Sequence, residues 1–364
     1  MMRKRPAETV LNSNNKKRQK NRSNINQRAT DIMMLEPVKL ALNEHLSRKN
    51  LSSLSRVSHS ARNIAINSTR TFDIDLPYLG FNKNDKPVQN IIEKLTFFPA
   101  LTTLKLRYNH TYTKNCSLVK VLENIPQSVK SLHIYGSVNI DDALEILGKN
   151  KALKLRDFLV DSPYSNQIIN VDKLARLADL QTFSIDGIIS VSVQGQLGDV
   201  KSSLKKFSVK CRDWLQGSEH LKKYLAAHKE TLQYISLSAN DAKVVNKSFA
   251  INEICASLHR DYHAVFQKLS HVSGFTDNVP GIYEDMSWLE KAFPNIQNVQ
   301  LDLEVPYRPH DYNSLVPAKT IKLANKLPSK LNYIKLSGIF NLVLHTGKIP
   351  NGLQIETEIK FPGN

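Results

Sequence analysis

Apolar residues recur along most of the chain in one short pattern: an apolar residue, two others, an apolar residue, one other, and a third apolar residue. From Leu101 to Leu232 the first residues of these units stand 24 to 28 residues apart. The units are Leu101/Leu104/Leu106, Val129/Leu132/Ile134, Leu155/Phe158/Val160, Leu180/Phe183/Ile185, Leu204/Phe207/Val209, Leu232/Ile235/Leu237, Ile296/Val299/Leu301 and Leu331/Ile334/Leu336. Because alternate side chains of an extended chain point to opposite faces, each unit predicts a short strand with one buried face.

Helical stretches are predicted between these strands, at residues 118–123, 141–147, 171–180, 219–228 and 286–293. The gap of 64 residues from Leu232 to Ile296 fits two units, the middle one degenerate near Leu269. A single unit cannot bury its own apolar face, so we expect neighbouring units to stack into one continuous core. The pattern predicts an α/β array with a parallel sheet over residues 73–364, with ordinary α/β crossovers as the alternative.

A different pattern precedes the array and predicts a short helical module at residues 31–72. Its apolar residues stand three or four apart, on one face of each of two short helices joined by a polar turn in which Asn50 can cap the second helix. The residues are Val38, Leu42, Leu46, Leu51, Leu54 and Val57. An ordinary helical cap on the array would need the same apolar stripe.

This spacing resembles the F-box, the module by which substrate receptors dock on the Skp-type adaptor of cullin–RING ubiquitin ligases. The stretch Arg56-Val57-Ser58 is similar to the end of the family's second-helix motif, whereas the family's late Trp is absent, with Ala61 near its place. The strand-and-helix units resemble leucine-rich repeats. Together the two resemblances imply a short helical F-box-like module followed by a curved leucine-rich-repeat solenoid with a parallel sheet.

The resemblance implies a non-catalytic substrate-recognition subunit of an SCF-type ligase. Its partners would be a Skp-type adaptor with its cullin, and a protein target of unknown identity held on the repeats. The six apolar residues of the helical module would bind the adaptor. A nuclear leucine-rich-repeat scaffold without ligase association, and a nucleic-acid-associated protein, are the alternative functions.

The first thirty residues form a basic tail that we expect to be disordered. They hold nine Lys or Arg residues and one acid, Glu8, in a chain whose net charge is +17. Two basic clusters separated by a polar stretch are similar to a bipartite nuclear localisation signal, read by an import receptor as extended peptide. The residues are Lys4, Arg5, Lys16, Lys17, Arg18 and Lys20. Nuclear localisation is therefore expected, with the cytoplasm as the alternative, and nucleic acid would bind only nonspecifically through the tail.

The polar residues that alternate with the apolar ones would share the other face of the predicted sheet. Basic and acidic positions alternate along the array and tyrosines are interspersed, which suits a protein target better than a continuous basic stripe for nucleic acid. The candidate target-binding residues are Lys105, Arg107, His133, Tyr135, Asp157, Asp161, Asp186, Lys206, Lys210 and Tyr234.

Several kinds of chemistry are not supported by any motif. No glycine-rich phosphate loop or Gly-x-Ser-x-Gly elbow occurs, and no apolar run approaches the length of a membrane span. Three cysteines match neither a disulfide framework nor a zinc spacing. His259 and His263 stand four apart on a predicted helix, but no third metal ligand is evident. We therefore expect no enzyme activity, cofactor, metal or membrane partner.

Overall fold

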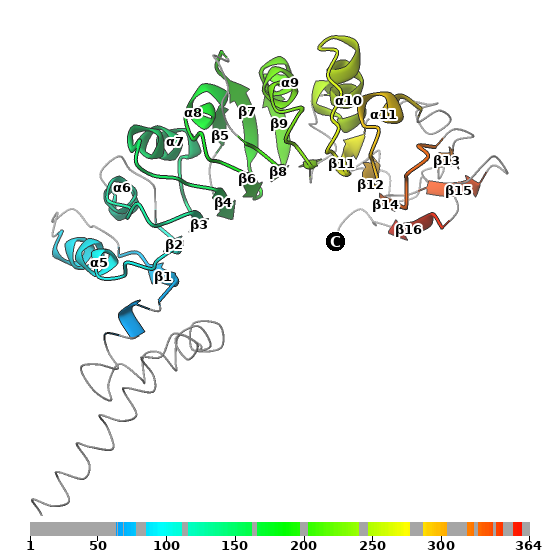
Figure 1. Ribbon diagram of the computed structural model, residues 1–364. Coiled ribbons are helices and arrows are strands. Elements are labelled where there is room, and N and C mark those ends of the chain that lie inside the picture. The colour runs from blue at the N-terminus through cyan, green and yellow to red at the C-terminus, as the bar shows by residue number, and fades with distance from the viewer. Residues whose placement is uncertain are drawn as a thin grey trace, which may run out of the picture. The chain divides into compact units, whose positions relative to one another are not determined.

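The computed structural model (Figure 1) describes residues 63, 65–67, 69–77, 85–110, 116–161, 166–196, 203–239, 247–276, 287–303, 319–323, 327–337, 340–344 and 352–358. The predicted basic tail lies outside these residues, as do all six candidate adaptor-binding residues of the helical module. The chain divides into two compact units, Met1–Phe72 with Glu93–Thr102, and Asp73–Ile92 with Thr103–Asn364. The boundary passes through strand β1 (Thr71–Asp75) and helix α5 (Lys86–Thr96).

One sheet of eleven strands is the main element of the fold, which is α/β. Its strand order, β1-β2-β3-β4-β6-β8-β10-β11-β12-β14-β16, follows the order of the chain. The strands after β1 are β2 (Thr103–Tyr108), β3 (Ser131–Gly136), β4 (Asp157–Asp161), β6 (Thr182–Asp186), β8 (Lys206–Cys211), β10 (Tyr234–Ala239), β11 (His271–Thr276), β12 (Asn298–Leu303), β14 (Tyr333–Ser337) and β16 (Gln354–Glu358). Neighbouring strands from β2 to β16 are parallel. Each strand predicted from the apolar pattern is present.

The register keeps equivalent positions of the pattern side by side from β2 to β16. Leu132 on β3 pairs with Leu104 and Phe158, and Phe207 on β8 pairs with Phe183 and Ile235. Phe158, Phe183 and Phe207 are fully buried, with ring centroids 6.1 and 5.5 Å apart along the row. Such aromatic contacts add to the free energy already gained by burying the rings. The apolar positions therefore form one core that runs across the strands.

Helices lie along one side of the sheet in the larger unit (Figure 1). They are α6 (Ser117–Glu123), α7 (Ile140–Lys149), α8 (Val171–Ala175), α9 (Ser218–Ala227), α10 (Ile251–Arg260), which follows the short 3-10 helix η1 (Lys247–Phe249), and α11 (Ser287–Ala292). Each contacts the next along the row.

The helix predicted at residues 171–180 is wrong in its length, since α8 ends at Ala175. Leu177 and Leu180 are buried in the turns that lead into β6. The apolar spacing that predicted a longer helix therefore reflects burial of these two residues in the core.

Two smaller parallel sheets were not predicted from the sequence. One consists of β5 (Gln167–Asn170), β7 (Ser190–Gln194) and β9 (Asp213–Gln216), and the other of β13 (Lys319–Leu323) and β15 (Phe340–Leu344). Whereas α7 and α9 occupy the connections before β4 and before β10, the described part of the connection between β6 and β8 holds no helix but the strand β7. Its Val191 and Val193 are buried, so it closes the core as a helix does elsewhere.

Strand β11 is the degenerate unit expected near Leu269, and Gly274 explains why the pattern fails there. Gly274 pairs with Leu237 and Leu301, so it occupies the third apolar position. A Cβ atom at Gly274 would stand 2.7 Å from the Cβ of Ile251 and 2.8 Å from the carbonyl oxygen of Leu237. Ile251, at the start of α10, thus fills the volume that a side chain would take at position 274.

We expect Gly274→Ala to destabilise the fold by about 1–3 kcal/mol, because neither contact atom is the end of a flexible side chain. Gly148→Ala is the matched control. Its Cβ would meet only Arg176, at 3.5 Å, and it lies in α7, where alanine is favoured over glycine by about 0.5–1 kcal/mol. Urea denaturation measures both. Equal midpoints for the two variants would contradict this account of β11.

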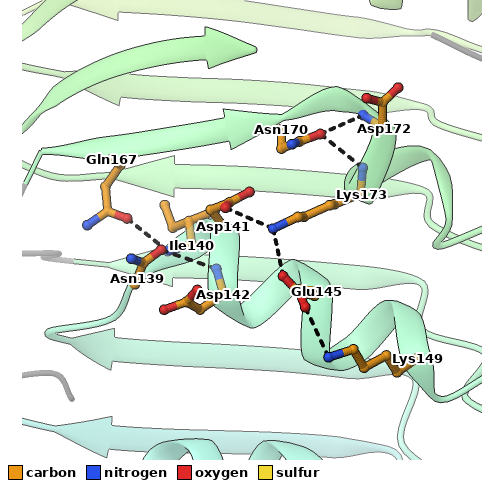
Figure 2. A network of polar contacts seen from close by, with 10 residues as sticks. All are labelled: Asn139, Ile140, Asp141, Asp142, Glu145, Lys149, Gln167, Asn170, Asp172 and Lys173. Carbon is orange, nitrogen blue, oxygen red and sulfur yellow. Dashed lines mark hydrogen bonds and ion pairs between the residues drawn. The ribbon is translucent and has the colours of Figure 1, made fainter. Parts of the chain in front are cut away.

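A polar network joins α7 to the segment around α8 (Figure 2). The Lys173 ammonium lies 2.8 Å from Asp141 and 2.9 Å from Glu145, and Lys149 lies 3.0 Å from Glu145. Burial lowers the pKa of Lys173, but its hydrogen bonds to both carboxylates raise that pKa more, leaving it above its ordinary value. The hydrogen bond from Lys173, with that from Lys149, lowers the pKa of Glu145 to about 2.

Amide side chains set the start of these helices. The Asn139 side chain accepts a hydrogen bond from the Asp142 amide at the start of α7. Asn170 does the same for the amides of Asp172 and Lys173 at the start of α8 (Figure 2). Gln167 is buried; it accepts from the Ile140 amide and donates to the Val138 carbonyl. These bonds satisfy backbone groups that helix and strand ends leave without partners.

The lowered pKa of Glu145 predicts a pH dependence. A carboxyl whose pKa is lower in the folded state stabilises it above the pKa of the unfolded chain, and that stabilisation is lost as the pH falls through about 2. Glu145→Gln should therefore be less stable than the parent at neutral pH, and the difference should vanish near pH 2. Glu123→Gln is the control, because Glu123 is exposed and has no ion-pair partner among the described residues. A Glu145→Gln difference that is constant with pH would refute the network's role.

Candidate protein-binding face

The face of the eleven-stranded sheet away from the helices, here called the strand face, carries the predicted target-binding positions. All ten predicted residues lie on its strands, and none of them is buried. They alternate along each strand with the buried apolar residues. The strand face presents three clusters of polar and aromatic side chains, which the register brings together from neighbouring strands.

The first cluster joins β1, β2, β3 and β4. Arg107 lies 2.8 Å from Asp73, and its guanidinium is 5.9 Å from the centroid of the Tyr135 ring. The other neighbour of Tyr135 is His133, whose ring centroid is 4.0 Å away. The Nε2 atom of His133 is 2.8 Å from Asp161. The predicted residues Arg107, His133, Tyr135 and Asp161 are thus in one chain of contacts.

The electrostatic setting of Tyr135 follows from this arrangement. Burial, then the carboxylates of Asp161 and Asp73, raise the pKa of the Tyr135 hydroxyl, although Arg107 acts in the opposite direction. The hydroxyl therefore stays protonated well above neutral pH and can donate a hydrogen bond. Arg107 lies 3.8 Å from Asp75 as well as 2.8 Å from Asp73. The cation of this cluster therefore already has carboxylate partners.

The second cluster lies on β6, β8, β10 and β11. The Lys206 ammonium is 4.8 Å from the centroid of the Tyr234 ring, and the opposite neighbour of Tyr234 is His271, stacked at 4.2 Å with 5° between the ring planes. Burial, and then the charge of Lys206, lower the pKa of His271. Its Nε2 atom is buried without a hydrogen-bond partner. Lys210 lies 3.4 Å from Asp186, and both side chains are half exposed.

The third cluster is at the other end of the sheet, on β14 and β16. Lys335 lies 2.8 Å from Glu356 and 3.2 Å from Glu358. The Tyr333 hydroxyl donates a hydrogen bond of 2.6 Å to Glu356. The hydrogen bonds to these glutamates raise the pKa of Lys335, and the bond from Lys335 lowers the pKa of Glu356. The charges of this cluster are paired among themselves.

Several members of the clusters were missed by the sequence analysis. Asp73 and Asp75 belong to β1 and the two glutamates Glu356 and Glu358 to β16, and neither strand carries the complete apolar pattern. His271 belongs to the degenerate strand β11. The strand register, which makes equivalent positions neighbours, places His271 beside Tyr234 and Glu356 beside Lys335.

Two candidates for chemistry are not supported by the geometry. Helix α10 ends at Arg260, and His263 lies beyond it with a φ of 47°, so the expectation that His259 and His263 share one helix is wrong. No group of three potential metal ligands occurs among the described residues. Cys211 and Cys255 are buried, and burial raises the pKa of both thiols. None of the described helices is long and apolar enough to cross a membrane.

Comparison with known proteins finds no matching family model and no match among curated proteins.

The division between core and strand face can be tested on two adjacent residues of β6. We expect Phe183→Asp to lower the free energy of unfolding by about 4 kcal/mol or more, because it places an unpaired carboxylate in a fully buried position. Ser184→Asp introduces the same group on the strand face and should cost less than about 1 kcal/mol. Thermal denaturation followed by circular dichroism measures both variants. Similar losses would show that the assignment of faces is wrong.

Proposed function

We propose that this protein is a non-catalytic substrate-recognition subunit of a cullin–RING ubiquitin ligase of the SCF type, and that it holds a protein target on the strand face. The observation that carries the proposal is the sheet whose strands follow the chain order, with one apolar face closed and one polar face presented. This is the arrangement expected of a leucine-rich-repeat solenoid. The F-box-like pattern at residues 31–72 supplies the ligase part of the proposal.

The composition of the strand face favours a protein over nucleic acid as the target. Its charges alternate in sign along the sheet. Arg107 at one end and Lys335 at the other are paired with carboxylates, and Lys206 and Lys210 lie between these two ends. A nucleic-acid surface needs a continuous run of positive charge to follow the phosphates. Tyrosines at positions 135, 234 and 333 suit a protein interface, where aromatic residues are enriched.

A receptor of this kind would act through proximity. The helical module would bind the Skp-type adaptor while the strand face binds the target, so that a lysine of the target is held near a charged ubiquitin carrier. Holding two reactants together raises their effective concentration without requiring chemistry from the receptor itself. The basic tail would be read by an import receptor and would bring the protein to the nucleus.

The test is co-purification of the intact chain with a Skp-type adaptor and its cullin. We expect the adaptor to bind the parent protein, and Leu51→Ala with Leu54→Ala to abolish this binding, since truncating anchor residues of an interface commonly costs more than about 1 kcal/mol each. The thermal melt of the double variant should match that of the parent.

The alternative, a helical cap on the array, predicts the opposite pair of results. The double variant would then lose stability, and the parent would bind no adaptor. Lys154→Ala is a control for both measurements, because Lys154 is exposed and lies outside the strand face.

A further inference from the structure

The second cluster of the strand face contains a cation without an ion-pair partner among the described residues. The Lys206 ammonium contacts the Tyr234 ring instead of a carboxylate. Lys210, on the same face of the same strand, has Asp186 at 3.4 Å, and this pair is half exposed on both sides. An exposed pair of this kind contributes little to stability, because water screens it. The middle of the strand face thus offers two ammonium groups to a partner.

Short side chains lie between the two lysines. Ser208 stands between Lys206 and Lys210 on β8, and the register pairs it with Ser184 on β6 and Ser236 on β10. Ser236 pairs in turn with Ser273 on β11. The four serines form a row that crosses adjacent strands, in which Ser236 and Ser273 are buried. With strands about 4.8 Å apart the row is about 14 Å long, which matches about four residues of extended chain.

Longer side chains border this serine row. The Lys206, Tyr234 and His271 side chains lie on one border, where the stacking of Tyr234 on His271 holds the rings in place. Lys210 and Asp186 lie on the other. Lys206 and Lys210 are four residues apart on one strand, or about 13 Å between their Cα atoms, so their long side chains can reach a chain lying above Ser208.

We propose that this part of the strand face binds an extended acidic segment of the target, with two adjacent carboxylates taken by Lys206 and Lys210 across the serine row. The proposal rests on the strand face being a protein-binding surface, as proposed above. Side chains of an extended segment alternate in direction, so two adjacent acidic residues point to opposite borders and meet one lysine each. Charge-assisted hydrogen bonds of this type are about twice as strong as neutral ones.

Other groups of the second cluster suit the same acidic segment. The hydroxyls of Ser184 and Ser208, which are partly exposed, can donate to carboxylates or to the segment's backbone carbonyls. The Nε2 atom of His271 is buried without a hydrogen-bond partner and stands on the Lys206 border. A basic segment would instead meet two like charges here, and like charges brought together at an interface are strongly unfavourable.

The experiment measures binding of a labelled peptide in which pairs of glutamates are separated by serines. The full-length chain is used, with Lys16→Ala, Lys17→Ala and Arg18→Ala in every sample so that the basic tail does not dominate. Lys206→Glu with Lys210→Glu should weaken binding by about tenfold or more, as expected for the loss of two charge-assisted contacts. Lys206→Gln with Lys210→Gln should weaken it less, because no repulsion is added.

Two controls make the result specific. Lys205→Glu with Lys229→Glu makes the same change in net charge at exposed lysines outside the two borders and should leave binding within about twofold. A peptide with glutamine in place of glutamate should not bind. Circular dichroism melts confirm that each variant is folded.

Three outcomes would overturn the proposal: equal weakening by the control pair, binding that survives both substitutions at Lys206 and Lys210, or tighter binding of a short single-stranded RNA at the same lysines.

Adaptor co-purification on the same samples separates this proposal from the proposed function. An adaptor that binds while the peptide does not would refute only the acidic segment. A peptide that binds at these lysines without any adaptor would refute the ligase assignment and leave the peptide site intact.

Discussion

Most strands of the main sheet have two inward apolar side chains that a single strand cannot bury alone, and the rest of the structure depends on this constraint. Leu132 and Ile134 on β3 are fully buried because β2 and β4 flank them and the helical layer covers them. A strand of five or six residues with such a face is not stable in isolation. At β16, the last of the described strands in the sheet, the equivalent Ile355 is only half-buried and Thr357 is exposed. The order of strands along the chain, their shared register and the stacked phenylalanines all follow from burying these pairs against neighbours.

The same constraint leaves the strand face free to vary. An inward substitution disturbs the core of three strands, whereas an outward one changes only the contacts within a cluster. The outward positions therefore differ in charge and shape from strand to strand while the inward ones stay apolar. The connections are also free to vary, provided that they close the core: α7 and α9 do so as helices, and β7 does so with Val191 and Val193.

The sequence predicted the strands of the main sheet well because their apolar triplets repeat at a nearly constant period. It failed where the physical signal is shorter or sits in another element. Strand β5 has four residues and buries the polar Gln167 beside Ile169, so no alternation of apolar and polar residues marks it. Gly274 breaks the pattern on β11 because Ile251 of α10 supplies the missing volume, and that compensation cannot be recognised from local sequence.

The candidate site was predictable to the same extent. Outward residues of complete units were identified, but their pairing needed the register: His133 and Asp161 are 28 residues apart in the chain and 2.8 Å apart in space. Members on incomplete units, such as His271, were missed. The F-box-like module and the basic tail lie outside the described residues, and the interpretation of both stays a prediction from sequence.

The pairing of charges gives the parts of the strand face different capacities for binding. At the ends of the sheet, Arg107 and Lys335 already have carboxylate partners, and a ligand that contacts them must replace an ion pair within the protein. The exchange yields little net free energy, because one charge-assisted contact is lost for each one gained. At Lys206 no such partner is displaced, and the aromatic ring beneath the ammonium orients it without neutralising its charge. A partner therefore gains most from contacts in the middle of the sheet, while the paired clusters at the ends contribute shape and exclude partners whose charges cannot match theirs.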